Sequence, residues 1–248
     1  MSAVATYTLR LGDDALVAAQ RLAGWISRAP ELEEDLALAN IALDLLGQAR
    51  SLLTYAGSFD GRSEDDLAYL RDEREFCNVQ FVELPNGDFG MTIARMLFFS
   101  AYQYLLYDRL SGSADPTLAA VAARAVKEVA YHRDHAVQWT LRLGDGTDES
   151  HVRMQAALEA CWPYTAELFE SDALTREVAA AGVGVDPGTF SPQWASFVDG
   201  ILKEATLTVP VLPARVTGGR RGIHTEHMGY LLAEMQYLRR SYPEDTEW

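Results

Sequence analysis

Cysteine is scarce in this sequence: Cys77 and Cys161 are the only two among 248 residues, and they form no CxxC motif. Two distant thiols indicate neither a disulfide framework nor a thiolate zinc site. No stretch approaches twenty uninterrupted apolar residues, and residues 1–12 lack the basic start and apolar run of a targeting signal. We therefore expect a protein of the reducing cytoplasm with no membrane anchor.

Basic residues are also few, since 21 Lys and Arg stand against 36 Asp and Glu, which gives a formal net charge of -15. A field of this sign repels phosphate backbones and attracts basic protein surfaces, so nucleic-acid binding is disfavoured. Hydrophobic residues make up 48% and charged residues 23%, a balance typical of folded globular proteins. We expect one domain spanning residues 1–248.

No strand-rich region is evident, and Gly and Pro separate long segments with helical spacing of apolar residues. Gly12 and the two aspartates that follow it resemble a helix cap, and Pro30 ends the first segment. Helices are predicted over 13–28, 31–56, 88–111 and 116–143. The third is apolar on nearly every side, which predicts a central, buried helix.

A long connection joins the second and third predicted helices, and Ser63 with Asp66 forms the pattern of a capping box within it. Two helical hairpins separated by about thirty residues are typical of a four-helix bundle with one long crossover, the ferritin-like order. Further helices are predicted over 148–170, with a kink at Pro163, over 192–208 and over 225–241. The predicted fold is all-α: a ferritin-like bundle with additional C-terminal helices.

A ferritin-like bundle that binds two irons needs a Glu from each of two helices and Glu-x-x-His from each of two others. The residues three before the five histidines are Val129, His132, Asp148, Arg221 and His224, so Glu-x-x-His never occurs. Asp148 with His151 begins a predicted helix, where acids usually serve as caps. Between residues 15 and 30 and between 89 and 107 there is no acid at all. The sequence therefore predicts no di-iron pair in this chain.

Polar residues predicted to lie inside the bundle form a second group of candidates. They are Gln20, Asn40, Asp44, Gln48, Gln103, Glu128 and His132. We expect a hydrogen-bonded network in the space that a metal would occupy, with Glu128 paired to His132 one helical turn away. The alternative is that Glu128, His132 and His135 form an acid/base or single-metal cluster.

The densest group of histidines is His224, Glu226 and His227, around Thr225. We expect Thr225 to cap the last helix, with capping and contacts between subunits favoured over metal ligation.

Many segments of the chain together resemble the C subunits of phenylacetyl-CoA 1,2-epoxidases. The resemblance rests on residues 12–16, 30–35, 39–50 (ANIALDLLGQAR), 63–68, 71–76 (RDEREF), 85–89, 143–147 (LGDGT), 162–164 and 224–227 (HTEH). It implies a structural, non-catalytic, ferritin-like subunit of a multicomponent monooxygenase that epoxidises the aromatic ring of phenylacetyl-CoA in aerobic phenylacetate catabolism. It also implies pairing with a catalytic A subunit that carries the di-iron centre, and a reductase that passes electrons from NADPH through FAD and an iron-sulfur cluster.

The resemblance further implies which residues replace the metal ligands. One Glu-x-x-His window of the catalytic relative falls on 45–48 and the other on 129–132, so that Leu45, Gln48 and Val129 occupy ligand positions and only His132 is retained. Asp44 and Glu128 each precede a lost carboxylate by one position, which turns them about 100° round the helix. No cofactor is expected in this chain. Self-association, a helical enzyme based on Glu128, His132 and His135, and a free-standing binding module stay open.

Overall fold

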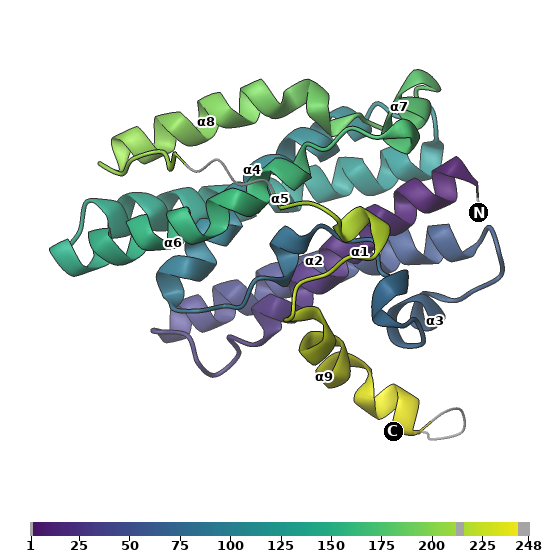
Figure 1. The fold of residues 1–248 in the computed structure, drawn as a ribbon, viewed down its shortest axis with the longest axis horizontal. Coiled ribbons are helices and arrows are strands. Elements are labelled where there is room, and N and C mark those ends of the chain that lie inside the picture. The colour runs from purple at the N-terminus through teal and green to yellow at the C-terminus, as the bar shows by residue number, and fades with distance from the viewer. Residues whose placement is uncertain (1, 212–215, 243–248) are drawn as a thin grey trace.

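The computed structural model describes residues 2–211 and 216–242, and within these ranges all regular structure is helical. The helices are α1 (Ala3–Ala23), α2 (Leu32–Gly57), α3 (Glu64–Tyr69), α4 (Phe89–Leu110), α5 (Pro116–Gly144), α6 (Asp148–Leu168), α7 (Ala173–Ala180), α8 (Ser191–Glu204) and α9 (Met228–Ser241). Figure 1 shows α9 projecting away from the packed body of the other helices.

Two helical hairpins form the bundle, α1 with α2 and α4 with α5, and α2 packs against α5 to join them. A long crossover connects the hairpins through α3 and two short 3₁₀ turns, Glu73–Glu75 and Gln80–Glu83. The predicted capping box of α3 is confirmed, because Ser63 Oγ accepts from the Asp66 N–H at 3.1 Å and the Asp66 carboxylate accepts from the Ser63 N–H at 2.8 Å. The all-α, ferritin-like arrangement is therefore the one that the sequence predicted.

Helix α4 lies at the centre, as predicted from its apolar residues on every side. It packs against α5, α6 and α8, and its Phe98 and Tyr107 are almost completely buried. Trp162 and Trp194 each pack at 5.6 Å from the Phe98 ring, and the Trp194 indole N–H donates to the Phe98 carbonyl at 3.0 Å. Aromatic packing thus fixes α6 and α8 against the bundle.

Helix α1 begins at Ala3, ten residues before the predicted start at residue 13. Gly12, Asp13 and Asp14 lie in the middle of the helix and are buried, so the expectation that they form a cap is wrong. Two tertiary interactions explain this. The two carboxylates pair with Arg71 and Arg220, and a Cβ at Gly12 would stand only 2.8 Å from a methyl of Leu53. Residues that read as a helix start are used here for close packing and buried ion pairs.

The C-terminal third differs from the prediction in smaller ways. Helix α7 was not predicted, and α6 continues through Pro163. The last helix begins at Met228, so Thr225 does not cap it as expected. Instead the Thr225 hydroxyl and N–H both donate to Glu83. The hydroxyl also accepts from the His227 N–H at 3.3 Å, so Thr225 joins the segment before the last helix to a distant carboxylate.

By length and hydropathy alone, α2 is the one helix in the described ranges that could cross a membrane. A core helix of a helical bundle passes the same test, and α2 packs against α1 and α5 here. Only 44% of the most apolar window of α2 is buried. More than half of this apolar segment is therefore not buried by the rest of the chain.

Replacing Leu52 by Ala tests the contribution of the core. Leu52 is fully buried, so its truncation should lower the free energy of unfolding by about 2–5 kcal/mol. Leu238→Ala is the matched control because Leu238 is 58% exposed on α9, and it should change stability by less than about 0.5 kcal/mol. Urea unfolding followed by circular dichroism measures both, and equal losses would contradict this account of the core.

Candidate functional site

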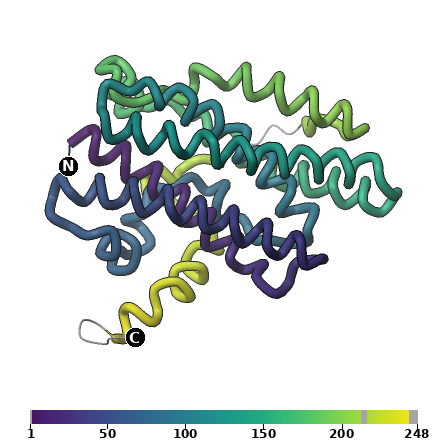
Figure 2. Tube along the Cα trace, turned by 180° about the vertical axis from the view of Figure 1, so that it is seen from behind, coloured from purple at the N-terminus to yellow at the C-terminus, as the bar shows by residue number. Residues whose placement is uncertain are grey.

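The centre of the bundle is apolar at two of the four positions that the resemblance aligned with metal ligands. Leu45 of α2 and Val129 of α5 are 3% and 0% exposed, and both belong to the continuous core. Gln48 and His132, from the same two helices, are buried as well. In the view of Figure 2, which is turned by 180° from Figure 1, α2 and α5 run across the side nearest the viewer. The correspondence of these positions to the ligands of a catalytic relative stays a prediction.

Polar side chains connect α2 to α5 in three separate pairs. His132 Nε2 lies 3.0 Å from Asp44 Oδ2, His135 Nε2 lies 2.8 Å from Glu34 Oε2, and the Gln48 amide donates to Glu128 Oε2 at 3.0 Å. Burial lowers the pKa of His132 and outweighs the opposing hydrogen bond and charge of Asp44. A neutral ring that donates from Nε2 to Asp44 satisfies this geometry.

The expected pairing of Glu128 with His132 is wrong. Each residue reaches across to α2 instead, and the second oxygen of Glu128 accepts from Arg124 at 2.7 Å, one turn earlier on α5. Spacing of four residues along a helix permits a contact between neighbours, but a partner on the facing helix competes with it. The partners of Glu128 and His132 are therefore set by the α2 residues that lie opposite them, Gln48 and Asp44.

The other predicted interior residues divide by position. Asn40 is exposed and Asp44 is partly exposed, with 37% of its side chain accessible, so the interior placement of Asn40 is wrong. Gln20 is half-buried at the edge of a surface groove, whereas Gln103 is buried. Of the three residues in the alternative cluster, His132 and His135 each contact a separate carboxylate of α2.

A small cavity of about 30 Å³ lies beside His132 in the bundle. Its lining includes Arg95, Met96, Ser100 and Gln103 of α4 together with Ile41 and Leu45 of α2. Arg95 donates to the Leu84 carbonyl and to Asn86 Oδ1, and burial lowers the pKa of its guanidinium to about 10. Most of the lining is hydrocarbon, so the cavity supplies few groups that bind ions.

Within residues 2–211 and 216–242, no group of three or more His, Cys, Asp or Glu side chains is arranged to hold a metal ion. The polar pairs between α2 and α5 fasten the two hairpins together. They give a partner to one polar atom of each side chain, while Gln48 Oε1 and His135 Nδ1 are buried without a hydrogen-bond partner among the described residues. The three polar pairs therefore help to hold α2 and α5 together.

A second polar centre, which the sequence did not predict, surrounds the crossover. Asp13 pairs with Arg71, whose side chain is 4% exposed, and Asp14 pairs with Arg220 at 2.7 Å. Arg220 also donates to the carbonyls of Arg10 and Cys77. Removing one member of a buried pair leaves an uncompensated charge, so these pairs bind α1 to the crossover and to the C-terminal segment.

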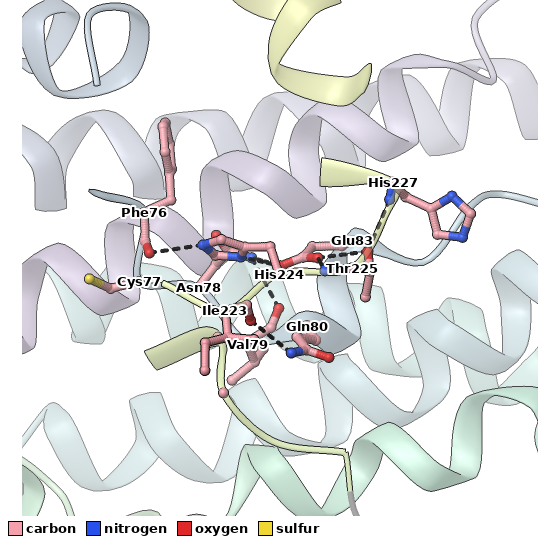
Figure 3. Close-up of polar contacts among 12 residues, drawn as sticks. Phe76, Cys77, Asn78, Val79, Gln80, Glu83, Ile223, His224, Thr225 and His227 are labelled. Atoms are coloured by element: carbon pink, nitrogen blue, oxygen red, sulfur yellow. Dashed lines mark hydrogen bonds and ion pairs between the residues drawn. The ribbon is translucent and has the colours of Figure 1, made fainter. Parts of the chain in front are cut away.

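Glu83 and His224 form the most enclosed part of this centre, and neither side chain is exposed (Figure 3). His224 Nδ1 lies 2.6 Å from Glu83 Oε1, and its Nε2 lies 3.1 Å from the Phe76 carbonyl. Both neighbours accept hydrogen bonds, so the imidazole is fully satisfied when both ring nitrogens carry protons. Burial acts to lower the pKa of His224, but Glu83 and the Phe76 carbonyl together raise it above its ordinary value.

Glu167 completes the centre by accepting three backbone N–H groups, from Gln80 at 2.6 Å, Gly218 at 2.8 Å and Gly219 at 2.7 Å. A Cβ at Gly219 would stand 2.1 Å from the Asn78 carbonyl, so glycine is required for this close approach. Carboxylates inside an otherwise apolar helix, as at Asp13 and Asp14, were the sequence signal that could have indicated the centre. Glu83 and Glu167 carried no such signal.

Fold and site together define a helical bundle whose buried carboxylates are used for internal contacts. The chain belongs to the family of phenylacetic acid catabolic proteins, whose model matches residues 1–248. Among curated proteins, it is similar to the C subunit of 1,2-phenylacetyl-CoA epoxidase from Escherichia coli (strain K12). The two are 51% identical over 244 residues, which is 98% of each chain. The resemblance noted in the sequence is thereby confirmed.

Replacing Arg220 by Leu tests the ion pair with Asp14. The change leaves a buried carboxylate without its cation, and we expect a loss of about 3–5 kcal/mol in the free energy of unfolding. Arg153→Leu is the control, since that side chain is 59% exposed and its pair with Glu149 should contribute less than about 1 kcal/mol. A loss of similar size in the two variants would contradict the assigned role.

The Glu83–His224 pair predicts a pH dependence of stability. Because the folded pKa of His224 is raised, its contribution is complete below the ordinary value of 6.5 and is lost as the pH rises through the folded pKa. The difference in unfolding free energy between the native chain and His224→Gln should therefore shrink with increasing pH. Denaturant titrations over a pH series measure it, and a difference that grows with pH would contradict the assignment.

Proposed function

We propose that this chain is the structural, non-catalytic subunit of a phenylacetyl-CoA epoxidase complex, and that it pairs with and stabilises the catalytic, di-iron A subunit. The observation that carries the proposal is the burial of Leu45 and Val129 in the hydrophobic core at the aligned ligand positions. A hydrocarbon side chain at such a position cannot ligate a metal. Membership of the family and the similarity to the C subunit of an epoxidase supply the biological setting.

The polar contacts of the bundle support the same role. His132, the retained position, contacts Asp44, while Gln48 contacts Glu128. These residues join α2 to α5 and keep the bundle rigid for a partner surface. Under this proposal the complex works in the cytoplasm, the di-iron centre resides in the partner, and FAD and an iron-sulfur cluster reside in the reductase.

Metal analysis of the purified chain, alone and with its catalytic partner, tests the proposal. We expect iron to copurify with the partner, and we expect the isolated chain to contain far less than one iron per chain. Stoichiometric iron in the isolated chain would overturn the structural role.

Replacing His132 by Ala separates the structural role from a catalytic one based on Glu128, His132 and His135. The variant loses the contact with Asp44 and leaves a cavity, so its unfolding free energy should fall by about 1–3 kcal/mol. The assembled complex should keep its turnover within about twofold. Loss of turnover in a complex that assembles normally and retains its iron would favour the helical-enzyme alternative.

A further inference from the structure

A few side-chain atoms in the described part of the chain are buried and have no hydrogen-bond partner there. They are Arg10 Nε, Gln48 Oε1, Asn78 Oδ1, Ser100 Oγ, His135 Nδ1 and Glu170 Oε2. Arg10 and Glu170 differ from the rest because they line the same cavity. Their chemistry is complementary, since the guanidinium N–H donates a hydrogen bond and the carboxylate oxygen accepts one. The two atoms therefore indicate a shared ligand.

The cavity lies between α1, α4 and the chain that follows α6, and its volume is about 20 Å³. Its apolar walls include Leu11 of α1, Leu106 of α4 and Pro187. A water molecule needs a cavity of roughly 10–15 Å³ or more. The cavity is therefore large enough for one water molecule and too small for an organic ligand.

Arg10 and Glu170 each have an ion-pair partner, but through another atom. Arg10 Nη1 donates to Asp172 Oδ2 at 2.7 Å, and Glu170 Oε1 lies 3.5 Å from Arg221 Nη1. Within residues 2–211 and 216–242, no ion pair joins Arg10 directly to Glu170. Because an unpaired buried donor or acceptor destabilises the folded state, Arg10 Nε and Glu170 Oε2 both need a further partner.

Tyr7, Thr175, Glu167 and Arg220 also line the cavity, and their polar groups have partners elsewhere. The Tyr7 hydroxyl accepts a backbone N–H at 3.1 Å, and the Thr175 hydroxyl accepts the Asp172 N–H at 3.0 Å. Glu167 and Arg220 belong to the polar centre around the crossover. A ligand in the cavity is therefore held mainly by the two atoms that still need a partner.

We propose that one water molecule is bound in this cavity and bridges Arg10 to Glu170. The water oxygen accepts from the Arg10 Nε–H, and one of its O–H groups donates to Glu170 Oε2. An anion would be repelled by the Glu170 carboxylate, and a cation would be repelled by the Arg10 guanidinium. A small neutral molecule that both accepts and donates suits the two groups, and water is the molecule of that class that fits the volume.

The bridge gives α1 a second connection to the turn between α6 and α7. Arg10 lies on α1, Glu170 stands two residues after the end of α6, and Asp172 is the N-cap of α7. Arg10 therefore holds this turn directly through Asp172 and, in the proposal, through the water to Glu170. Water-mediated hydrogen bonds of this kind are nearly as favourable in enthalpy as direct ones.

Glu170→Met tests the proposal in the purified chain, because it removes the acceptor and keeps a side chain of similar length. A crystal structure of the native chain should show one density peak within hydrogen-bond distance of both Arg10 Nε and Glu170 Oε2. The peak should be absent in the variant. Oxygen-17 relaxation dispersion in solution should count one long-lived water molecule fewer per chain in the variant than in the native chain.

Glu159→Met is the matched control, since Glu159 is exposed on α6 and contacts Gln155 of the same helix. It should leave the number of long-lived water molecules unchanged and lower the equilibrium constant for folding by less than about threefold. Glu170→Met should lower this constant by about 5- to 30-fold, because it leaves the Arg10 Nε–H without a partner.

Arg10→Lys provides a second test that does not depend on Glu170→Met folding well. A lysine keeps the positive charge opposite Asp172 but has no N–H at the Nε position. It should therefore also lose one long-lived water molecule. In the double variant, Glu170→Met should reduce the folding constant by less than it does in the native chain, because the bridge has already been removed.

Several results would overturn the proposal. They are a native crystal structure with no density between the two atoms, a direct contact of Arg10 with Glu170, an unchanged count of long-lived water molecules in both variants, and a bound halide identified by bromide anomalous scattering. None of these measurements involves iron or the catalytic subunit. The water proposal and the proposed function can therefore fail independently.

Discussion

The structure depends on one constraint, that a carboxylate taken out of water must find a cation or several hydrogen-bond donors. The described part of the chain buries four carboxylates, Asp13, Asp14, Glu83 and Glu167. Arg71, Arg220, His224 and three backbone N–H groups satisfy them. Because the partners come from the crossover and from the segment before α9, these contacts hold the parts of the chain that lie outside the four main helices.

The same constraint applies to the middle of the bundle. In a ferritin-like metal protein, metal ions neutralise the inward carboxylates. Here Leu45 and Val129 occupy the middle of the bundle, and the acids near them pair with His132, His135 or Gln48 across α2 and α5. Hydrocarbon packing and hydrogen bonds to the carboxylates of α2 and α5 hold the two hairpins together there.

The chain also exposes apolar side chains on two of its helices. One side of α2 contributes to the core, while Leu32, Leu36 and Leu43 of the same helix and Tyr230 and Tyr237 of α9 are exposed. Exposed apolar surface of this kind is suited to contacts with other polypeptides.

The sequence by itself determined the all-α class, the order of the hairpins and the absence of Glu-x-x-His, because helical periodicity and motif spacing are local properties. The family resemblance, confirmed by the comparisons, was also readable from local segments. The tertiary structure alone decided which polar groups meet. The position of Asp13 inside α1, the pairing of Glu128 with Gln48 and the contact of Thr225 with Glu83 all follow from partners distant in the chain. Local sequence patterns predicted that these residues form helix caps or pair with a neighbour one turn away. The need of buried polar groups for partners, which come from distant parts of the chain, decided their contacts instead.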